Sequence, residues 1–224
     1  RSGWRHALVA LMPALVLAVS VWLALRFGDR PWIWIPAWVA FGFVVFSLTT
    51  LLHEVVHGLV TEKQRPALRR ALAWLYAAGS GLSASQFGRW HLDHHRWLGA
   101  EQGDPKRAEL SPKKNARWLK LLYLTPGLFP ISVRAAKRAG EDYPAELKSR
   151  IRRERVVSVL LHLGVLVALW LMVGPFAAAR VYLIPVFLVF PFAFTLNRIG
   201  QHYDVKASDP ARWGTLLRPS PWLL

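Results

Sequence analysis

Six of the eight histidines of this chain fall in three short groups, and their spacing could bring them to a common centre. The groups are HEVVH, HLDHH and QHY, and their histidines are His53, His57, His91, His94, His95 and His202. On a helix, spacings of three and four residues place side chains on one face. Neutral imidazole binds iron, zinc, copper or nickel, and six imidazoles exceed the needs of one tetrahedral zinc ion. The pattern therefore predicts a histidine-rich site for two metal ions.

The absence of cysteine narrows the chemistry of such a site. Thiolate zinc sites, iron–sulfur clusters and cysteine nucleophiles are excluded, so other ligands must be carboxylate, amide or backbone oxygen. Glu54 and Asp93 each lie within a histidine group, and we expect them to orient a ligand histidine through its other ring nitrogen. Arg198 precedes His202 by four residues, shares its helical face and is a further polar candidate beside it.

All three histidine groups lie at or beyond the end of a long uncharged run. About 20 apolar residues in a helix cross the hydrocarbon core of a bilayer, which is about 30 Å thick. We predict one all-α integral membrane domain over 1–224, with four transmembrane helices in two hairpins at about 7–26, 31–52, 156–174 and 180–197. The segment 58–155 is expected to form a helical cytoplasmic cap that carries histidine boxes, with interfacial helices near 67–79 and 116–124.

The basic residues give the chain a net charge of +16, and their distribution indicates an orientation. Of the 29 lysines and arginines, 26 fall on the side that holds 58–155 and both termini, and the opposite side has only Arg26, Arg30 and Arg180. By the positive-inside rule the majority side is cytoplasmic. Membrane topology thus explains the charge, and no nucleic-acid partner is expected. The Ala-, Arg- and Trp-rich composition points to a bacterial inner membrane.

HEVVH followed by HLDHH resembles the first two histidine boxes of the membrane fatty acid desaturase and hydroxylase superfamily. The QHY group resembles the EHY segment of its alkane hydroxylase members, and 209–218 resembles the stretch before the third box of bacterial desaturase-like sequences. Four spans with a large cytoplasmic segment between the second and third are also similar to this superfamily. The resemblance covers nearly the whole chain. It implies two iron ions held mainly by histidines, and O2 as co-substrate. Asn197 is expected either to hold a metal-bound water, as an Asn does in related desaturases, or to form a hydrogen bond at the end of its helix.

The resemblance implies a reaction on a lipid in the membrane. Desaturation of a fatty acyl chain is the expected function, and hydroxylation or ketolation of a lipid, alkane or carotenoid stays open because the outcome depends on how the chain is placed. The sequence has no GxGxxG dinucleotide fingerprint and no cysteine for a cluster. Electrons are therefore expected from an external ferredoxin, rubredoxin or cytochrome b5-like donor.

The third box of that superfamily, HxxHH or QxxHH, is absent from the 224 residues. We therefore expect the chain to be truncated before this box and to be inactive, with at least one metal position under-coordinated. His162 is a poor substitute ligand because it lies about six residues, or about 9 Å, inside the third predicted span. We expect it to be a packed, neutral histidine hydrogen-bonded to a neighbouring helix.

Two other classes of function fit parts of the pattern. HExxH is also a zinc protease signature, in which His53 and His57 bind zinc and Glu54 is the general base. An intramembrane zinc metalloprotease leaves the remaining four histidines of the three groups unexplained. A membrane scaffold that has lost its chemistry would bind no metal at all.

Overall fold

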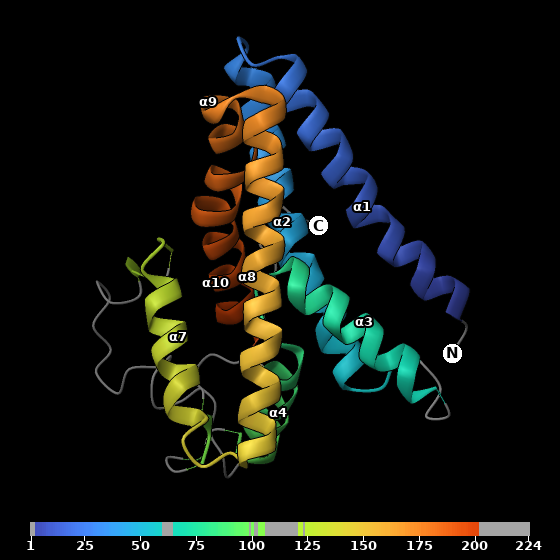
Figure 1. The fold of residues 1–224 in the computed structure, drawn as a ribbon, viewed down its shortest axis with the longest axis vertical. Coiled ribbons are helices and arrows are strands. Elements are labelled where there is room, and N and C mark those ends of the chain that lie inside the picture. The colour runs from blue at the N-terminus through green and yellow to red at the C-terminus, as the bar shows by residue number, and fades with distance from the viewer. Residues whose placement is uncertain are drawn as a thin grey trace, which may run out of the picture.

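The computed structural model describes residues 3–59, 65–98, 100, 103–105, 121–122 and 124–201, and these residues form helices and turns without a strand. Figure 1 shows long helices joined in hairpins, with shorter helices gathered toward one end. The first hairpin contains α1 (Gly3–Arg26) and α2 (Pro31–Val56). The second begins with α8 (Ala145–Val173). Together with the arm that follows α8, these helices confirm the predicted all-α fold with four candidate membrane spans.

The returning arm of the second hairpin is one helical run of varying width. It consists of α9 (Pro175–Ala178), η1 (Ala179–Leu183), η2 (Pro185–Val189) and α10 (Phe190–Gln201). Gly174 makes the turn that follows α8. Its φ is +84°, a backbone conformation that residues other than glycine rarely adopt. The segments η1 and η2 are wide π-helical turns, and Pro185 between them lacks the N–H of a regular helical hydrogen bond.

The outer helices are apolar and are little covered by protein. In the most apolar part of each span, 11% of α1 and 6% of α8 are buried, against 44% of α2. Met12 and Trp22 on α1 are exposed, as are Leu171 and Met172 on α8. An apolar surface of this length suits lipid better than water. The chain is therefore a multi-pass membrane protein.

Helix α2 is the central element, because both hydrophobic clusters in the described residues contain it. The first cluster joins α2 to α3 (Pro66–Gly79) through Leu51, Leu52, Val55, Tyr76 and Ala77. The second cluster joins α2 to α10 through Phe41, Val45 and Phe190. The histidine end of α2 is thus packed against α3, and its middle is packed against the second hairpin.

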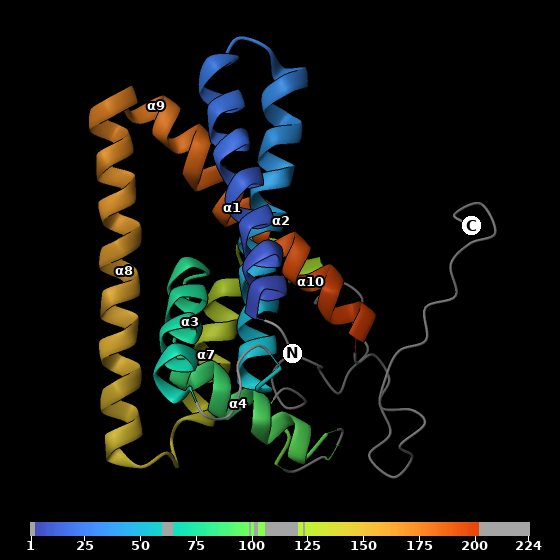
Figure 2. The same cartoon turned by 90° about the vertical axis from the view of Figure 1, so that its right-hand side faces the viewer.

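The turns of the two hairpins lie toward the same end of the molecule, opposite the short helices (Figures 1 and 2). The Arg180 guanidinium donates a hydrogen bond from Nη1 to the carbonyl of Gly28 at 2.9 Å. This contact agrees with the predicted topology, which places Arg180 and the turn between α1 and α2 on the same side.

The short helices α3, α4 (Ala84–Arg96) and α7 (Leu128–Ala139) lie at the other end (Figure 2). Helix α3 occupies the predicted interfacial helix at 67–79. Most of the second one, at 116–124, lies outside the described residues. Helix α8 begins well before the predicted span at 156–174, and its first turns are rich in arginine. This helix therefore extends beyond its apolar part to reach the short helices.

Gly42 of α2 allows η2 to approach closely. A Cβ atom added there would lie 2.4 Å from Cβ of Val189 and 3.0 Å from the backbone nitrogen of Phe190.

We expect Gly42→Ala to destabilise the protein by about 1–3 kcal/mol through overpacking, seen as a lower Tm of the purified protein in detergent. The matched control is Gly164→Ala on α8, where an added Cβ meets nothing within 4 Å. It should be neutral or slightly stabilising, and equal Tm values for the two variants would contradict this packing.

Candidate metal centre

The first histidine group lies in the last turn of α2, and a backbone motif determines where that helix ends. Gly58 follows His57 with a φ of +70°, a left-handed conformation that glycine adopts readily. The N–H of Gly58 donates to the carbonyl of Val55, and the N–H of Leu59 donates to that of Glu54, both at 3.0 Å. These two bonds form a Schellman motif, which closes the helix. Both imidazoles of HEVVH are therefore presented at the end of α2.

The second histidine group lies in the last two turns of α4. Ser83 caps the start of this helix, because its hydroxyl accepts a hydrogen bond from the N–H of Gln86 at 3.1 Å. The ring of Phe87 stacks on His91, with centroids 5.3 Å apart and an interplanar angle of 9°. His91 is buried and His95 is exposed. Helix geometry and ring stacking thus present the second group toward the end of α2.

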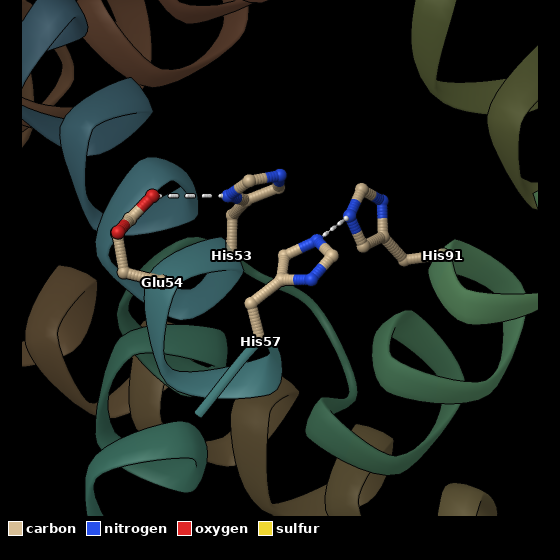
Figure 3. Close-up of polar contacts among 4 residues, drawn as sticks. All are labelled: His53, Glu54, His57 and His91. Atoms are coloured by element: carbon tan, nitrogen blue, oxygen red, sulfur yellow. Dashed lines mark hydrogen bonds and ion pairs between the residues drawn. The ribbon is translucent and has the colours of Figure 1, made fainter. Parts of the chain in front are cut away.

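Four imidazoles from these two helices converge. One ring nitrogen each of His53, His57, His91 and His95 can be chosen so that all four lie within 4.8 Å of one another. The Nε2 atoms of His57 and His91 are 2.9 Å apart (Figure 3). The ring centroids of His91 and His95 are 4.4 Å apart, and those of His53 and His57 are 4.5 Å apart. Residues separated by more than 30 positions are thus brought to one centre.

The donor spacing of these four side chains suits a single metal ion. At a metal–nitrogen distance of about 2.1 Å, two ligands at a right angle lie about 3 Å apart and two opposite ligands about 4.2 Å apart. The observed 2.9 Å and the 4.8 Å limit fall close to this range. Iron, zinc, copper and nickel all accept imidazole ligands, so the donor set suits a transition metal and does not select one of them.

His94 is placed differently from the other two histidines of its group. It is almost fully buried, and its Nδ1 lies 2.7 Å from Oδ1 of Asp104, which is equally buried. Its ring centroid is 5.6 Å from that of His95, so it lies beside the group of four and is not part of it. With Nδ1–H donating to the carboxylate, Nε2 is the nitrogen suited to bind metal. Asp104 precedes Pro105, and an Asp-Pro dipeptide is typical of loops and helix caps, so this residue carries no sequence signal of a contact with a histidine.

The two carboxylates expected to orient histidines have different partners. Oε1 of Glu54 lies 3.3 Å from Nδ1 of His53, as Figure 3 shows. Asp93 instead accepts a hydrogen bond of 2.7 Å from Nε of Arg89, four residues earlier on the exposed side of α4. This hydrogen bond raises the pKa of Arg89, so its guanidinium stays charged. The carboxylate found on a buried histidine of α4's group is therefore Asp104, and the prediction for Asp93 is corrected.

The described residues end just before the histidine of the third group. Asn197 and Arg198 lie near the end of α10, and nothing is described of the Arg198 side chain. His202 follows directly and lies outside the described residues. The expected contributions of these three residues to the site stay predictions.

His162 lies away from this centre. Its Nε2 is 2.9 Å from the carbonyl of Ala78, and its Nδ1 contacts the hydroxyl of Tyr182. A neutral ring satisfies both contacts, with Nε2–H donating to the carbonyl and the tyrosine hydroxyl donating to Nδ1. The expectation of a packed histidine bonded to neighbouring helices is confirmed.

The amino-acid sequence of this chain is similar to those of sphingolipid enzymes. The chain is 32% identical over 133 residues to the sphingolipid delta(4)-desaturase/C4-monooxygenase DES2 of Homo sapiens, which is 55% of this chain and 40% of that protein. It is 32% identical over 130 residues to DES2 of Bos taurus, covering 54% and 40%. It is 34% identical over 79 residues to the sphingolipid delta(4)-desaturase DES1 of Drosophila melanogaster, covering 34% and 25%. The aligned part thus spans less than half the length of these relatives.

A family model covers more of the chain. Residues 30–223 match the family described as fatty acid desaturase. The matched region contains all three histidine groups, the four converging imidazoles and every candidate span except the first. The chain belongs to the fatty acid desaturase family.

Proposed function

We propose that this protein is a membrane di-iron oxidoreductase that desaturates a long lipid chain, using O2 and electrons from an external donor. The observation that carries the proposal is the convergence of His53, His57, His91 and His95 at the end of a membrane helix. Family membership supports the same reading. In balance, desaturation consumes one O2, two electrons and two protons, removes two hydrogens from the chain and releases two waters.

The four converging histidines would hold one iron, and His94 together with His202 would contribute to the second. Bound iron would supply the reductive activation of O2 that allows attack on an unactivated C–H bond. Glu54 would orient His53 through its Nδ1. Asp104 would orient His94 in the same way. Asn197 is proposed to hold a metal-bound water. Arg198 is proposed to lie beside His202.

The substrate is proposed to be a long hydrocarbon chain that enters from the bilayer. The apolar, uncovered faces of α1 and α8 support this, because lipid chains would contact both helices. The names of the relatives add a substrate class, since DES2 and DES1 are sphingolipid desaturases. Hydroxylation is a second candidate outcome, because DES2 is also named a C4-monooxygenase.

The histidine end of the molecule is proposed to face the cytoplasm, at a bacterial inner membrane. The basic first turns of α8 and the last turn of α7, with Lys137 and Arg138, lie at the end of the molecule that holds the short helices. A ferredoxin, rubredoxin or cytochrome b5-like donor is proposed to deliver electrons from this side.

A zinc protease is less well supported. It would use His53 and His57 with Glu54 as a base acting on metal-bound water. The contact of Glu54 with Nδ1 of His53 and the presence of His91 and His95 in the same group favour the oxidoreductase.

Lipid analysis tests the proposed reaction. Expression of the full-length protein with a reducing system should convert a host acyl or sphingoid chain to a product lacking two hydrogens, detected by mass spectrometry. A product that gains one oxygen would favour the hydroxylase. Unchanged lipids from an iron-loaded, reduced protein supplied with both chain types would contradict both reactions.

Metal analysis tests the four-histidine group. We expect His57→Ala and His91→Ala in the full-length protein to lose most of the bound iron, because each removes a donor from the central pair. His6→Ala is the matched control, because His6 bonds the hydroxyl of Tyr76 and is not part of the group. Two irons in the parent protein and near-normal iron in the control are expected. One zinc per chain would instead indicate the protease.

Asp104 and Asp93 can be separated by paired substitutions. Asp104→Asn removes the carboxylate that accepts the Nδ1 proton of His94, and we expect iron affinity to fall about 10–100-fold. Asp93→Asn breaks only the exposed pair with Arg89 and should leave iron affinity unchanged. Iron titration of the apoprotein measures both. The reverse order of effects would restore the role first expected for Asp93.

A further inference from the structure

Three polar residues follow one face of α8 at intervals of four. They are Glu154, Ser158 and His162, and the helical repeat places them in a line that runs from the end of the molecule with the short helices into the apolar part of the span. Each of the three forms a hydrogen bond with the segment 78–85, which joins α3 to α4. We name these three residues the polar stripe of α8.

Glu154 holds the start of α4. Its Oε2 accepts hydrogen bonds from the Ser83 hydroxyl at 2.6 Å and from the N–H of Ser85 at 2.9 Å. Its Oε1 accepts a third, from the Ser85 hydroxyl, at 2.6 Å. The first turn of a helix has N–H groups without helical partners and a positive partial charge, so a carboxylate there is favourable on both counts.

Ser158 and His162 hold the end of α3. The Ser158 hydroxyl donates to the carbonyl of Ala78 at 3.2 Å, and Nε2 of His162 donates to the same carbonyl at 2.9 Å. Ser158 and Ala78 are both buried. This carbonyl lies in the last turn of α3 and also accepts a turn hydrogen bond from the N–H of Gly81 at 3.1 Å, so the two donors from α8 fasten the end of α3 at an acceptor outside the regular helical ladder.

A further contact adjoins the stripe. Arg155 donates through Nη2 to Oε1 of Gln86, and Nε2 of Gln86 donates to the carbonyl of Ala136 on α7 at 2.9 Å. The first turn of α4 is therefore bonded to α8 and α7 at once.

We infer that the polar stripe of α8, with Glu154 as its main positioning residue, sets where α4 stands and so holds His91 and His95 against the end of α2. His91 lies about two helical turns beyond Ser83, or about 12 Å along the axis. A tilt of the first turn would therefore displace both imidazoles. Ala84 and Phe87 of α4 pack against the cluster that α2 shares with α3, and the polar contacts with α8 fix the first turn of α4 relative to that cluster. The consequence for iron rests on the proposed function, whereas the placement of α4 does not.

The cysteine-free sequence allows a direct test of the placement. Spin labels on cysteines introduced at Leu92 of α4 and Arg152 of α8, both exposed, report the distance between the two helices in the 224-residue chain. We expect Glu154→Ala to shift or broaden the distance distribution, and Glu154→Gln, which keeps one acceptor oxygen, to have an intermediate effect. Glu146→Ala is the matched control, because Glu146 lies on the same helix and is largely exposed, in contact with Arg150. It should leave the distribution unchanged.

Iron titration of the same variants tests the link to the metal centre. Glu154→Ala should lower iron affinity about tenfold or more. Glu154→Gln should lower it less, and Glu146→Ala should leave it unchanged. An unchanged distance distribution in Glu154→Ala would overturn the positioning role. A changed distribution with unchanged iron affinity would overturn the link to the histidines.

Two further outcomes concern iron binding by the parent protein and folding of the Glu154→Ala variant. A parent protein that binds no iron would refute the proposed function, and the distance measurement would still decide the positioning role. If Glu154→Ala does not fold, Ser85→Ala replaces it, because that change removes the shortest bond to Oε1 and keeps the backbone bond. It should shift the distribution in the same direction by a smaller amount, and no shift would overturn the inference.

Discussion

Four imidazoles must come together at the point where a membrane helix ends, and many contacts in the described structure position them there. Two of them belong to α2, whose position is held by its packing against α1, α3 and α10. The other two belong to α4, a short helix with little apolar surface of its own. A helix of that kind takes its position from its neighbours. The buried cluster between α2 and α3, and the polar contacts from α8, supply the two sides of this support.

The second hairpin therefore has a role beyond crossing the membrane. Its first arm, α8, extends past the apolar region to contact both α3 and α4, and its second arm packs on the middle of α2. Arg180 joins the same hairpin to the first one at the far end. The two hairpins thus contact each other at the middle of α2 and at the far end, and α3 and α4 link them at the histidine end, while the outer faces of α1 and α8 are uncovered.

Hydropathy and histidine spacing were enough to predict the four candidate spans and the four histidines that converge, whereas His94 was predicted in the same set and lies beside it, and His202 lies outside the described residues. Both are local patterns, and each reports directly on one helix face or one length. They could not identify Asp104 as the partner of His94, because that contact crosses a turn and joins residues ten positions apart. They also misplaced Asp93, whose neighbour on the helix surface, Arg89, competes for its carboxylate. Glu154 was missed for a similar reason: its partners lie about 70 residues away, and no periodicity connects the two segments.

The way α2 and α4 end has an electrostatic consequence. Helix α2 closes at His57 and α4 closes just after His95, so the converging imidazoles occupy the final turns of both helices. Peptide dipoles give the carboxyl end of a helix a negative partial charge, which stabilises nearby cations by about 0.3–1 kcal/mol for each helix. The backbone thus attracts a cation to this point in addition to the side chains that would bind it. In a chain with a net charge of +16, two helix ends form a local region suited to positive ions.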